Sequence, residues 1–439
     1  MESQTTKSTR QRLAGLWRNA DFMKLWAGQT ISSLGSHITR DGLPLLAVIT
    51  LSATPAEMGI LSAVSGAPVL LFGLAAGVWV DRLRRRPVLV AADVGRALLL
   101  ASIPAAAFLG VLGMPQLYVV AALVGLLAVV FSVAYRSYLP SLVERTHIVE
   151  GNSKLAMSES VAELAGSGVT GVLVQVLTAP VAILLDSISF AASVVSIALI
   201  RKPEPPPAPP ESRKPILREL QEGLRLALGN PTLRALAGGA GTLAFLGNFF
   251  AALYGLYAIR VLGMGPAILG ITIAMGGVGS MLGAALAKPA AKRFGLGRAL
   301  MLSLVLGSCA SMLIPLARGP LPVAVAMMMA AQVFGDCFDT VYSVNETSLR
   351  QAITPDRLLG RMNATVGFVA DGAGPMGALV GGFLGGVVGL RPTLALAALG
   401  GACAAVWLFA SPIRRLQDHP VAATIDSATG NGSSHLRDR

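Results

Sequence analysis

Charged and aromatic residues are both scarce in this chain of 439 residues, at 13% and 5% of its composition. Hydrophobic residues reach 54%, which is more apolar surface than a water-soluble core of this length could bury. The few aromatic residues and the 49 glycines fit helices that pack closely in a membrane through small side chains. The composition therefore predicts an integral membrane protein and argues against a water-soluble one.

Cysteine is also rare, and the three copies Cys309, Cys337 and Cys403 lie in apolar stretches without paired spacing. We therefore expect no disulfide framework, no metal site and no cofactor. The N-terminus lacks a short apolar core followed by a small-residue cleavage site, so no cleaved signal peptide is expected. No HExxH spacing or nucleophile elbow occurs, which argues against an enzyme.

Twelve apolar stretches are long enough to cross a bilayer, which takes roughly 20 residues per helix. The first six lie near 22–52, 58–80, 86–110, 117–139, 155–176 and 179–200. The second six lie near 234–259, 266–288, 297–317, 321–344, 362–388 and 392–412. The predicted fold class is an all-α integral membrane protein with twelve transmembrane helices in two six-helix halves.

Basic residues alternate between the two sides of this predicted bundle. The N-terminal segment and the loops after spans two, four, six, eight and ten hold nearly all of them, whereas the opposite loops carry only Arg260, Arg318 and Arg391. The positive-inside rule then places both termini in the cytoplasm, with the chain in the plasma (inner) membrane. This distribution accounts for the net charge of +12 without nucleic acid as a partner. The expected partners are the lipid bilayer and a small molecule, with the chain as a monomer.

A proline-rich run, RKPEPPPAPPESRKP at residues 201–215, separates the two halves. We predict a cytoplasmic segment at 1–21, a first half at 22–200, a cytoplasmic linker at 201–233, a second half at 234–412 and a disordered cytoplasmic tail at 413–439. Within the linker, Ile216 to Leu228 spaces leucines at helical intervals. This pattern favours an amphipathic helix at the membrane surface, and a solvated connector helix is the open alternative.

The two halves match at a constant offset, which we call the repeat offset. Pro55 and Gly59 correspond to Pro266 and Gly270 (266 − 55 = 211). The same offset pairs Asn152, Gly166, Gly171 and Leu173 with Asn363, Gly377, Gly382 and Leu384. Parallel repeats of six helices joined by a long linker are typical of secondary transporters, which rock one half against the other around a site at the membrane midplane.

The loop between spans two and three reads GVWVDRLRRR, from Gly77 to Arg86. It resembles the G-x-x-x-D-R-x-G-R-R signature of the major facilitator superfamily, except that Arg84 replaces the last glycine. The resemblance covers the chain from Phe22 to Leu416. The passages LWAGQTISSLG and LPSLVERTHIVEGNSKL are similar to the macrolide-efflux and enterobactin-exporter branch of that family.

This resemblance implies that the loop stabilises the outward-open state, so it assigns Gly77, Asp81, Arg82 and Arg86 to gating. Asp81 is expected to face the positive N-terminus of a neighbouring helix such as span eleven. We group Arg136, at the cytoplasmic end of span four, with this gating set. The alternative is that the arginines only determine topology.

Charged residues inside spans are costly and usually mark a pathway. Span one carries His37, Arg40 and Asp41, and the following Gly42 and Pro44 predict a break in the helix about halfway across. His37 and Asp41 are four apart and share a helix face, so a proton relay between them is possible, whereas Arg40 and Asp41 point in different directions. The alternative is that Arg40 and Asp41 lie near the outer interface and extend into water.

Two further acidic pairs share helix faces: Asp336 with Asp339 in span ten, and Glu159 with Glu163 in span five. Because like charges so close in a membrane cannot all ionise, each pair is expected to retain a proton, as a proton-coupled carrier requires. The alternative is a structural ion pair between Glu159 and Arg136.

The resemblance implies that spans one, four, seven and ten line the cavity, which favours Asp336 as the proton site and admits Asn248 as a polar contact. A helix-bridging role for Asn248 is the alternative. We expect four other charged residues, Asp93, Arg96, Asp186 and Asp371, to make contacts between helices.

Together these features predict a secondary active transporter, a proton-coupled exporter (antiporter) of amphipathic small molecules such as drugs, macrolides or siderophore-like metabolites. The alternative is a facilitator or importer, or a lipid or siderophore carrier without proton antiport. An apolar cavity with few polar groups does not encode one substrate.

Overall fold

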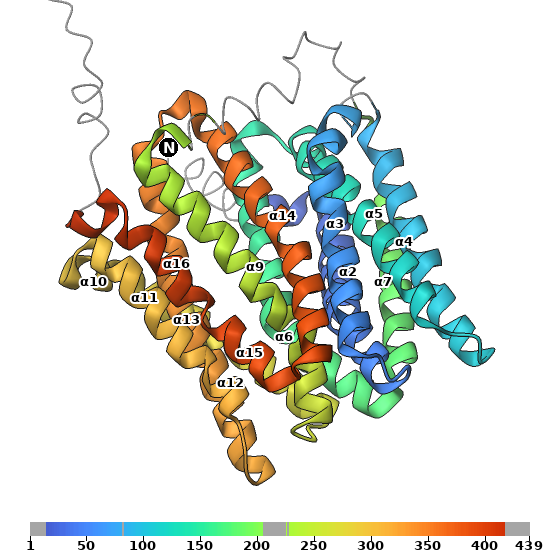
Figure 1. The fold of residues 1–439 in the computed structure, drawn as a ribbon. Coiled ribbons are helices and arrows are strands. Elements are labelled where there is room, and N and C mark those ends of the chain that lie inside the picture. Colours follow the sequence, from blue (N-terminus) through green and yellow to red (C-terminus); the bar gives the residue numbers. More distant parts are fainter. Residues whose placement is uncertain (1–14, 81–82, 205–224, 226–227, 418–439) are drawn as a thin grey trace, which may run out of the picture.

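The computed structural model describes residues 15–80, 83–204, 225 and 228–417, and these residues form a bundle of helices without a strand (Figure 1). Several predicted features lie outside the described residues: Asp81 and Arg82 of the gating loop, most of the linker with its amphipathic helix, the segment before Gly15 and the tail beyond Gln417.

The first half contains six long helices: α2 (Ala20–Ile49), α3 (Pro55–Val80), α4 (Arg85–Phe108), α5 (Met114–Leu142), α6 (Ile148–Leu177) and α7 (Ala179–Ala198). The second half contains α9 (Pro231–Arg260), α10 (Pro266–Phe294), α11 (Leu296–Ser311) with α12 (Leu313–Leu316), α13 (Leu321–Ile353), α14 (Asp356–Val387), and α15 (Leu390–Ala398) with α16 (Gly400–Phe409). Short 3₁₀ helices occur at Gly15–Arg18, Arg145–His147 and Pro412–Arg415.

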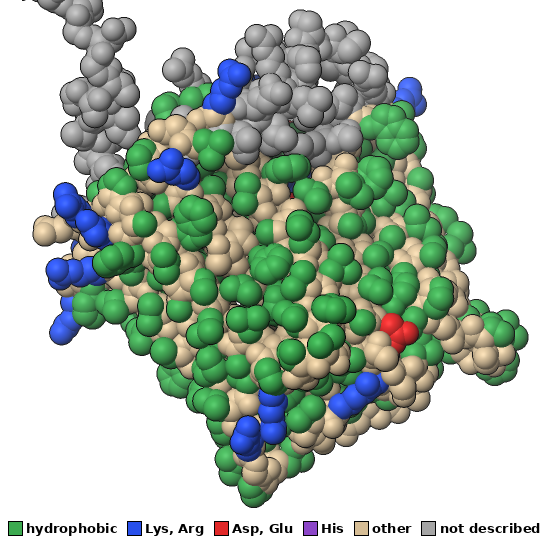
Figure 2. Space-filling view, in the orientation of Figure 1, with side chains coloured by type: hydrophobic (Ala, Val, Ile, Leu, Met, Phe, Trp, Pro, Cys, Tyr) green, Lys and Arg blue, Asp and Glu red, His purple; other side chains and the backbone are tan. Residues whose placement is uncertain are grey.

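In the described part of the chain, eleven helices are long and apolar enough to cross a membrane. The remaining long helix, α2, is not among them, because it carries Asp21, Lys24, His37, Arg40 and Asp41. It nevertheless packs inside the bundle against α6 and α7. Hydrophobic side chains cover most of the face shown in Figure 2, and Lys and Arg side chains lie near its ends. The all-α membrane fold of twelve helices predicted from the sequence is confirmed.

The repeat offset extends through the whole bundle. Helix α9 begins and ends at this offset from α2, and the α15–α16 pair does so from α7. Asn19 caps α2 with its side-chain oxygen, which accepts hydrogen bonds from the N–H groups of Asp21 and Phe22. Asn230, the equivalent residue of the second half, caps α9 in the same way. The sequence comparison shows the offset only in spans two and five.

The predicted break in span one is wrong, because α2 is continuous from Ala20 to Ile49 with Pro44 inside it. A proline removes one backbone donor and kinks a helix without ending it when neighbouring helices hold both sides. Here α7 and α6 pack along α2. At Gly42, an added Cβ atom would make ordinary contacts with Ile183 and Thr170 from these two helices, at 3.7 and 3.9 Å.

Helices α2 and α9 begin, and α7 ends, at one end of the bundle, which we call the linker end, and the opposite end is the far end (Figure 1). Two glycine contacts join the halves toward the far end, Gly59 with Gly382 and Gly171 with Gly270. A Cβ atom on Gly59 would lie 2.8 Å from the Cα of Gly382, and one on Gly171 would lie 2.9 Å from the Cα of Gly270. The repeat offset interconverts these contacts, so they are equivalent seams between the repeats.

The apolar core is shared at the far end and divided at the linker end. One cluster combines Leu46 and Met58 of the first half with Leu253 and Leu269 of the second. At the linker end, one cluster around Phe22 belongs to the first half, and a separate one around Leu349 belongs to the second. The bundle is therefore closed at the far end, and its halves separate toward the linker end.

The first residues after α7 are fixed to the first half. The Asp21 carboxylate accepts hydrogen bonds from the N–H groups of Arg201 at 3.2 Å and Lys202 at 3.0 Å. Glu204 accepts the N–H groups of Arg85 and Arg86 at 2.6 and 3.1 Å, and so caps α4, where an anion is favoured by the helix dipole. Residues 201–204 are thus held against the first half.

Candidate functional site

A cavity of about 1130 Å³ lies between the two halves, and both contribute to its walls. Most of the lining is apolar, from Leu, Val, Ile, Met and Phe side chains. The charged residues of the lining are Arg40, Asp41, Arg96, Arg136 and Asp186 from the first half and Asp336 from the second. The shared core closes the cavity at the far end.

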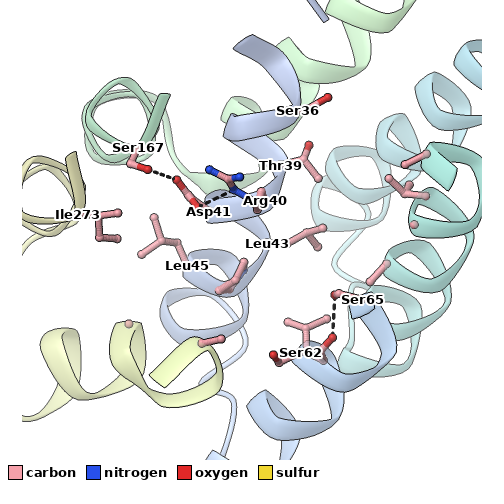
Figure 3. A pocket seen from close by; sticks show the side chains of 18 of the residues that line it. Ser36, Thr39, Arg40, Asp41, Leu43, Leu45, Ser62, Ser65, Ser167 and Ile273 are labelled. Carbon is pink, nitrogen blue, oxygen red and sulfur yellow. Dashed lines mark hydrogen bonds and ion pairs between the residues drawn. The ribbon is translucent and has the colours of Figure 1, made fainter. Parts of the chain in front are cut away.

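Helix α6 positions the charged group on α2 (Figure 3). Asp41 accepts a hydrogen bond from the Ser167 hydroxyl of α6 at 2.6 Å, and its other oxygen lies 3.7 Å from Nε of Arg40. A second guanidinium nitrogen of Arg40 lies 2.6 Å from Nδ1 of His37. His37 itself packs on Gly166 of α6, where any Cβ atom would overlap the imidazole.

The structure therefore joins both His37 and Asp41 to Arg40 rather than to each other. The sequence expectation that Arg40 and Asp41 point apart is wrong, because the long arginine side chain curls back toward its neighbour. Glu163, on α6, is exposed and does not line the cavity. Glu159 and Arg136 are both exposed, and no ion pair joins them within the described residues.

The second half contributes unpaired carboxylates. Asp336 lines the large cavity, and together with Asp339 it also lines a smaller chamber of about 220 Å³ inside the second half. Ser303, Ser308 and Ser311 line the same chamber. In the part of the chain that the structure describes, neither carboxylate has a hydrogen bond or an ion pair.

Asn248 lies elsewhere, at the contact of α9 with α14. Its amide nitrogen donates to the Ala244 carbonyl at 2.8 Å, and the side chain packs on Gly374. It is absent from the lining of both cavities. The geometry thus favours the helix-bridging alternative for Asn248.

The residues of the gating loop are only partly described. Gly77 belongs to α3, whereas Asp81 and Arg82 lie outside the described residues. Arg86 donates from its guanidinium to the Ala198 carbonyl at 2.5 Å, which ties the start of α4 to the end of α7. Arg136 is not part of this contact, and its exposed side chain lines the cavity.

Arg96 and Asp186 are cavity residues that the sequence did not reveal, because their charges were expected only to make contacts between helices. Asp186 does accept a hydrogen bond from the Thr39 hydroxyl of α2, and Arg96 pairs with Asp93 on its own helix. Both Arg96 and Asp186 also reach the cavity wall. The available signal was their charge at mid-span, which the sequence shows in spans three and six as clearly as in span one.

The sequence profile of the Major Facilitator Superfamily matches residues 25–335. The multidrug efflux pump Tap of Mycolicibacterium fortuitum is 27% identical over 367 residues, covering 82% of this chain and 88% of Tap. The MFS-type transporter YfiS of Bacillus subtilis is 27% identical over 230 residues, covering 50% of this chain and 52% of YfiS, so the match spans about half of that protein.

Among solved structures, a bacterial homologue of the iron transporter ferroportin in the inward-facing state superposes with a TM-score of 0.70. The identity is 15%, and the alignment covers 89% of this chain and 98% of that one. At this identity the likeness concerns the fold.

The chain belongs to the Major Facilitator Superfamily, because the family profile covers most of the bundle and the two-half fold agrees with it. It is a multi-pass membrane transporter, as predicted from the sequence. Membership of this family indicates a transporter.

Proposed function

We propose that this protein is a proton-coupled exporter of amphipathic small molecules that works by alternating access in the plasma membrane. The positive-inside rule makes the linker end cytoplasmic and the far end external. With the halves joined at the far end, the structure then represents an inward-open state.

The observation that carries this proposal is the placement of one carboxyl from each half on the wall of a largely apolar cavity. Asp41 lies on the wall of the first half and Asp336 on that of the second. Ionisable groups at such depth are costly and usually serve a substrate or ion pathway. A carboxyl that is neutral when protonated and charged when it releases its proton can bias the two halves differently in the two forms.

The cavity also fits an amphipathic substrate. Its volume of about 1130 Å³ is slightly above the usual range of small-molecule sites, roughly 300–1,000 Å³, so it has room for a large substrate. Its lining combines many apolar side chains with few charged ones. The similarity to the efflux pump Tap supports export, and the drug, macrolide or siderophore-like class stays part of the proposal.

In an alternating-access cycle, the two halves, the linker and the gating loop would each have a distinct role. The halves at 22–200 and 234–412 would rock as bodies joined by the linker at 201–233. In the outward-open state, the loop with Gly77, Asp81, Arg82 and Arg86 would latch the cytoplasmic side shut. Arg136 lies on the wall that this movement closes.

The test is transport of ethidium by purified protein in proteoliposomes with an imposed pH gradient. We expect wild-type protein to drive ethidium against its concentration gradient, and Asp41→Asn or Asp336→Asn to abolish that accumulation. Without a proton-binding carboxyl, the variants should still exchange ethidium down its gradient, which separates loss of coupling from loss of folding.

A matched control is Ser65→Ala, which removes a polar group from the same cavity without touching either acid. Unchanged accumulation in both Asp variants would reject the coupling assignment. Ethidium movement in the direction of the proton gradient would favour an importer, and movement independent of pH would favour a facilitator or a lipid or siderophore carrier.

A further inference from the structure

Three charged side chains form a cluster inside the first half, apart from Asp41 and Asp336. Asp93 and Arg96 belong to α4, and Asp186 belongs to α7. Neither carboxylate has exposed surface, and Arg96 is 6% exposed. The Arg96 guanidinium pairs with Asp93 and lies 4.3 Å from the ring centroids of both Phe131 and Phe190.

Asp186 is held by hydroxyl groups rather than by a cation of its own. It accepts hydrogen bonds from Thr39 on α2 and, at 2.9 Å, from Ser189 on α7. Thr39 is the neighbour of Arg40 in the chain, so the cluster is next to the charged group of the cavity wall.

The cluster contains one positive and two negative groups. Helices α2, α4 and α6 pack against α7. Among the described residues, α4 faces Asp186 with Asp93 and Arg96, and α6 adds no charged contact. Of the cations on α2, Arg40 lies beside Asp41 and His37, and Lys24 pairs with Asp21. With both carboxyls ionised, the cluster would hold an uncompensated negative charge in the protein interior, which is strongly unfavourable.

The hydrogen bonding of the cluster is incomplete in the described part of the chain. Oδ2 of Asp93 and Nε of Arg96 are buried and have no partner there. The buried Ser193 hydroxyl of α7, which also has no hydrogen-bond partner there, interacts with Asp93, so this open position can be filled without a proton. The excess of two carboxyls over one cation is what indicates a bound proton.

The second half has no such cluster on the equivalent helices. At the repeat offset, the positions equivalent to Asp93, Arg96 and Asp186 hold Leu304, Gly307 and Ala397. These three residues line the small chamber of the second half, where the carboxyls Asp336 and Asp339 come from α13 instead. In addition, Arg96 and Asp186 border the cavity, so the cluster lies directly behind its wall, and Arg96 is the member with exposed surface.

We propose that Asp186 binds one exchangeable proton while Arg96 pairs with Asp93. This proton site in the first half is separate from Asp41 and Asp336. On deprotonation the proton passes to water in the cavity, and Arg96 is then shared by two carboxylates. The use of this proton in transport rests on the function proposed above, whereas its binding does not.

The test is infrared spectroscopy of the full chain in lipid bilayers, following the carbonyl stretch of protonated carboxyl groups as pH is varied. Asp186→Asn leaves only the Asp93–Arg96 ion pair, and Asp93→Asn lets Arg96 pair with Asp186. Each variant should lose the intensity of a single protonated carboxyl. Arg96→Gln should have the opposite effect and gain intensity, because neither acid then has a cation.

Ser187→Ala is the matched control, since this buried serine of α7 donates to the Ala97 carbonyl and not to Asp186. It should leave the band intact. Asp186→Glu keeps a carboxyl and should move the band rather than remove it, which covers the case in which Asp186→Asn does not insert.

Equal intensity in wild type, Asp186→Asn and Asp93→Asn, or an unmoved band in Asp186→Glu, would overturn the proposal. Because the band is read without substrate, its loss in these variants would stand even if wild-type protein drove no ethidium in proteoliposomes. Failure of the proton site and failure of the exporter function are thus distinguishable.

Discussion

Two asparagines illustrate how single residues place the helices of the candidate site. Asn19 and Asn230 start α2 and α9, the first helix of each half. Their side-chain oxygens accept two backbone N–H groups each, at 3.0 to 3.1 Å for Asn19 and 2.9 to 3.3 Å for Asn230. These groups have no partner inside the helix, so the cap replaces hydrogen bonds to water.

We expect Asn19→Ala and Asn230→Ala each to lower the free energy of unfolding by about 1 kcal/mol, the usual value of such a cap. Unfolding in mixed detergent micelles would measure the change. Asn→Ser at the same positions retains a capping oxygen and is the control. Equal destabilisation by serine and alanine would show that something other than the cap is lost.

At this scale the sequence located charged residues but not their partners. That Asp41 and Asp336 belong to the same cavity followed from the implied arrangement of spans one and ten. The hydrogen bond from Ser167 to Asp41 could not be predicted in this way. It joins residues 126 positions apart, and it depends on which face α6 turns toward α2. Asn248 shows the same limit, since a polar residue in a span can face a cavity or a neighbouring glycine.

The helices meet through small residues, and the two seams at the far end depend on this. Gly171 of α6 and Gly270 of α10 approach so closely that a Cβ atom on either would lie 2.9 Å from the other's Cα. Gly59 and Gly382 form the equivalent seam between α3 and α14. Close helix approach through glycine is a common way to pack helices in membranes, where the hydrophobic effect does not drive association.

Gly171→Val should hold the far end open, because the added side chain meets the backbone of α10 and only separation of the helices relieves the overlap. We would measure labelling of Ser62→Cys, a cavity residue, by a membrane-impermeant thiol reagent added from outside, in a background without the native cysteines. The expected result is faster labelling than in the parent protein.

Gly168→Ala provides the control on the same helix. Its Cβ atom would lie 3.7 Å from that of Ala274, an ordinary contact, so its labelling rate should match the parent. If Gly171→Val labels no faster than Gly168→Ala, the glycine seam does not close the far end.

Helix positions were predicted well because each span is a long apolar run whose limits are set by charged or turn-forming residues. The repeat glycines were visible too, but their pairing across the halves was not, since it requires the pseudo-twofold arrangement of the bundle. The helix break at Pro44 was wrongly predicted because the sequence does not show that α6 and α7 hold the helix on both sides.

For the whole molecule, the constant repeat offset means that the glycine contact at one seam has a counterpart at the other. The charged groups do not follow this symmetry. Asp41 and the Asp93–Arg96–Asp186 cluster belong to the first half, and Asp336 with Asp339 belongs to the second, at positions where the other half has small or apolar residues. In the proposed cycle, the repeats would supply the movement, and the differences between them would supply the proton-binding groups.

The central claim is that protonation drives these halves between two states in which opposite ends are closed. Paired spin labels across the α6–α10 seam test it most directly. One pair would use Ser153→Cys and Lys288→Cys at the linker end, and the other Val176→Cys and Ile271→Cys at the far end; all four side chains are exposed.

Distances in lipid bilayers would be measured by pulsed electron paramagnetic resonance at acidic and alkaline pH. We predict that the two pairs change in opposite directions, so that one distance shortens as the other lengthens. Distances that do not change between the two pH values, or two distances that lengthen or shorten together, would contradict the account.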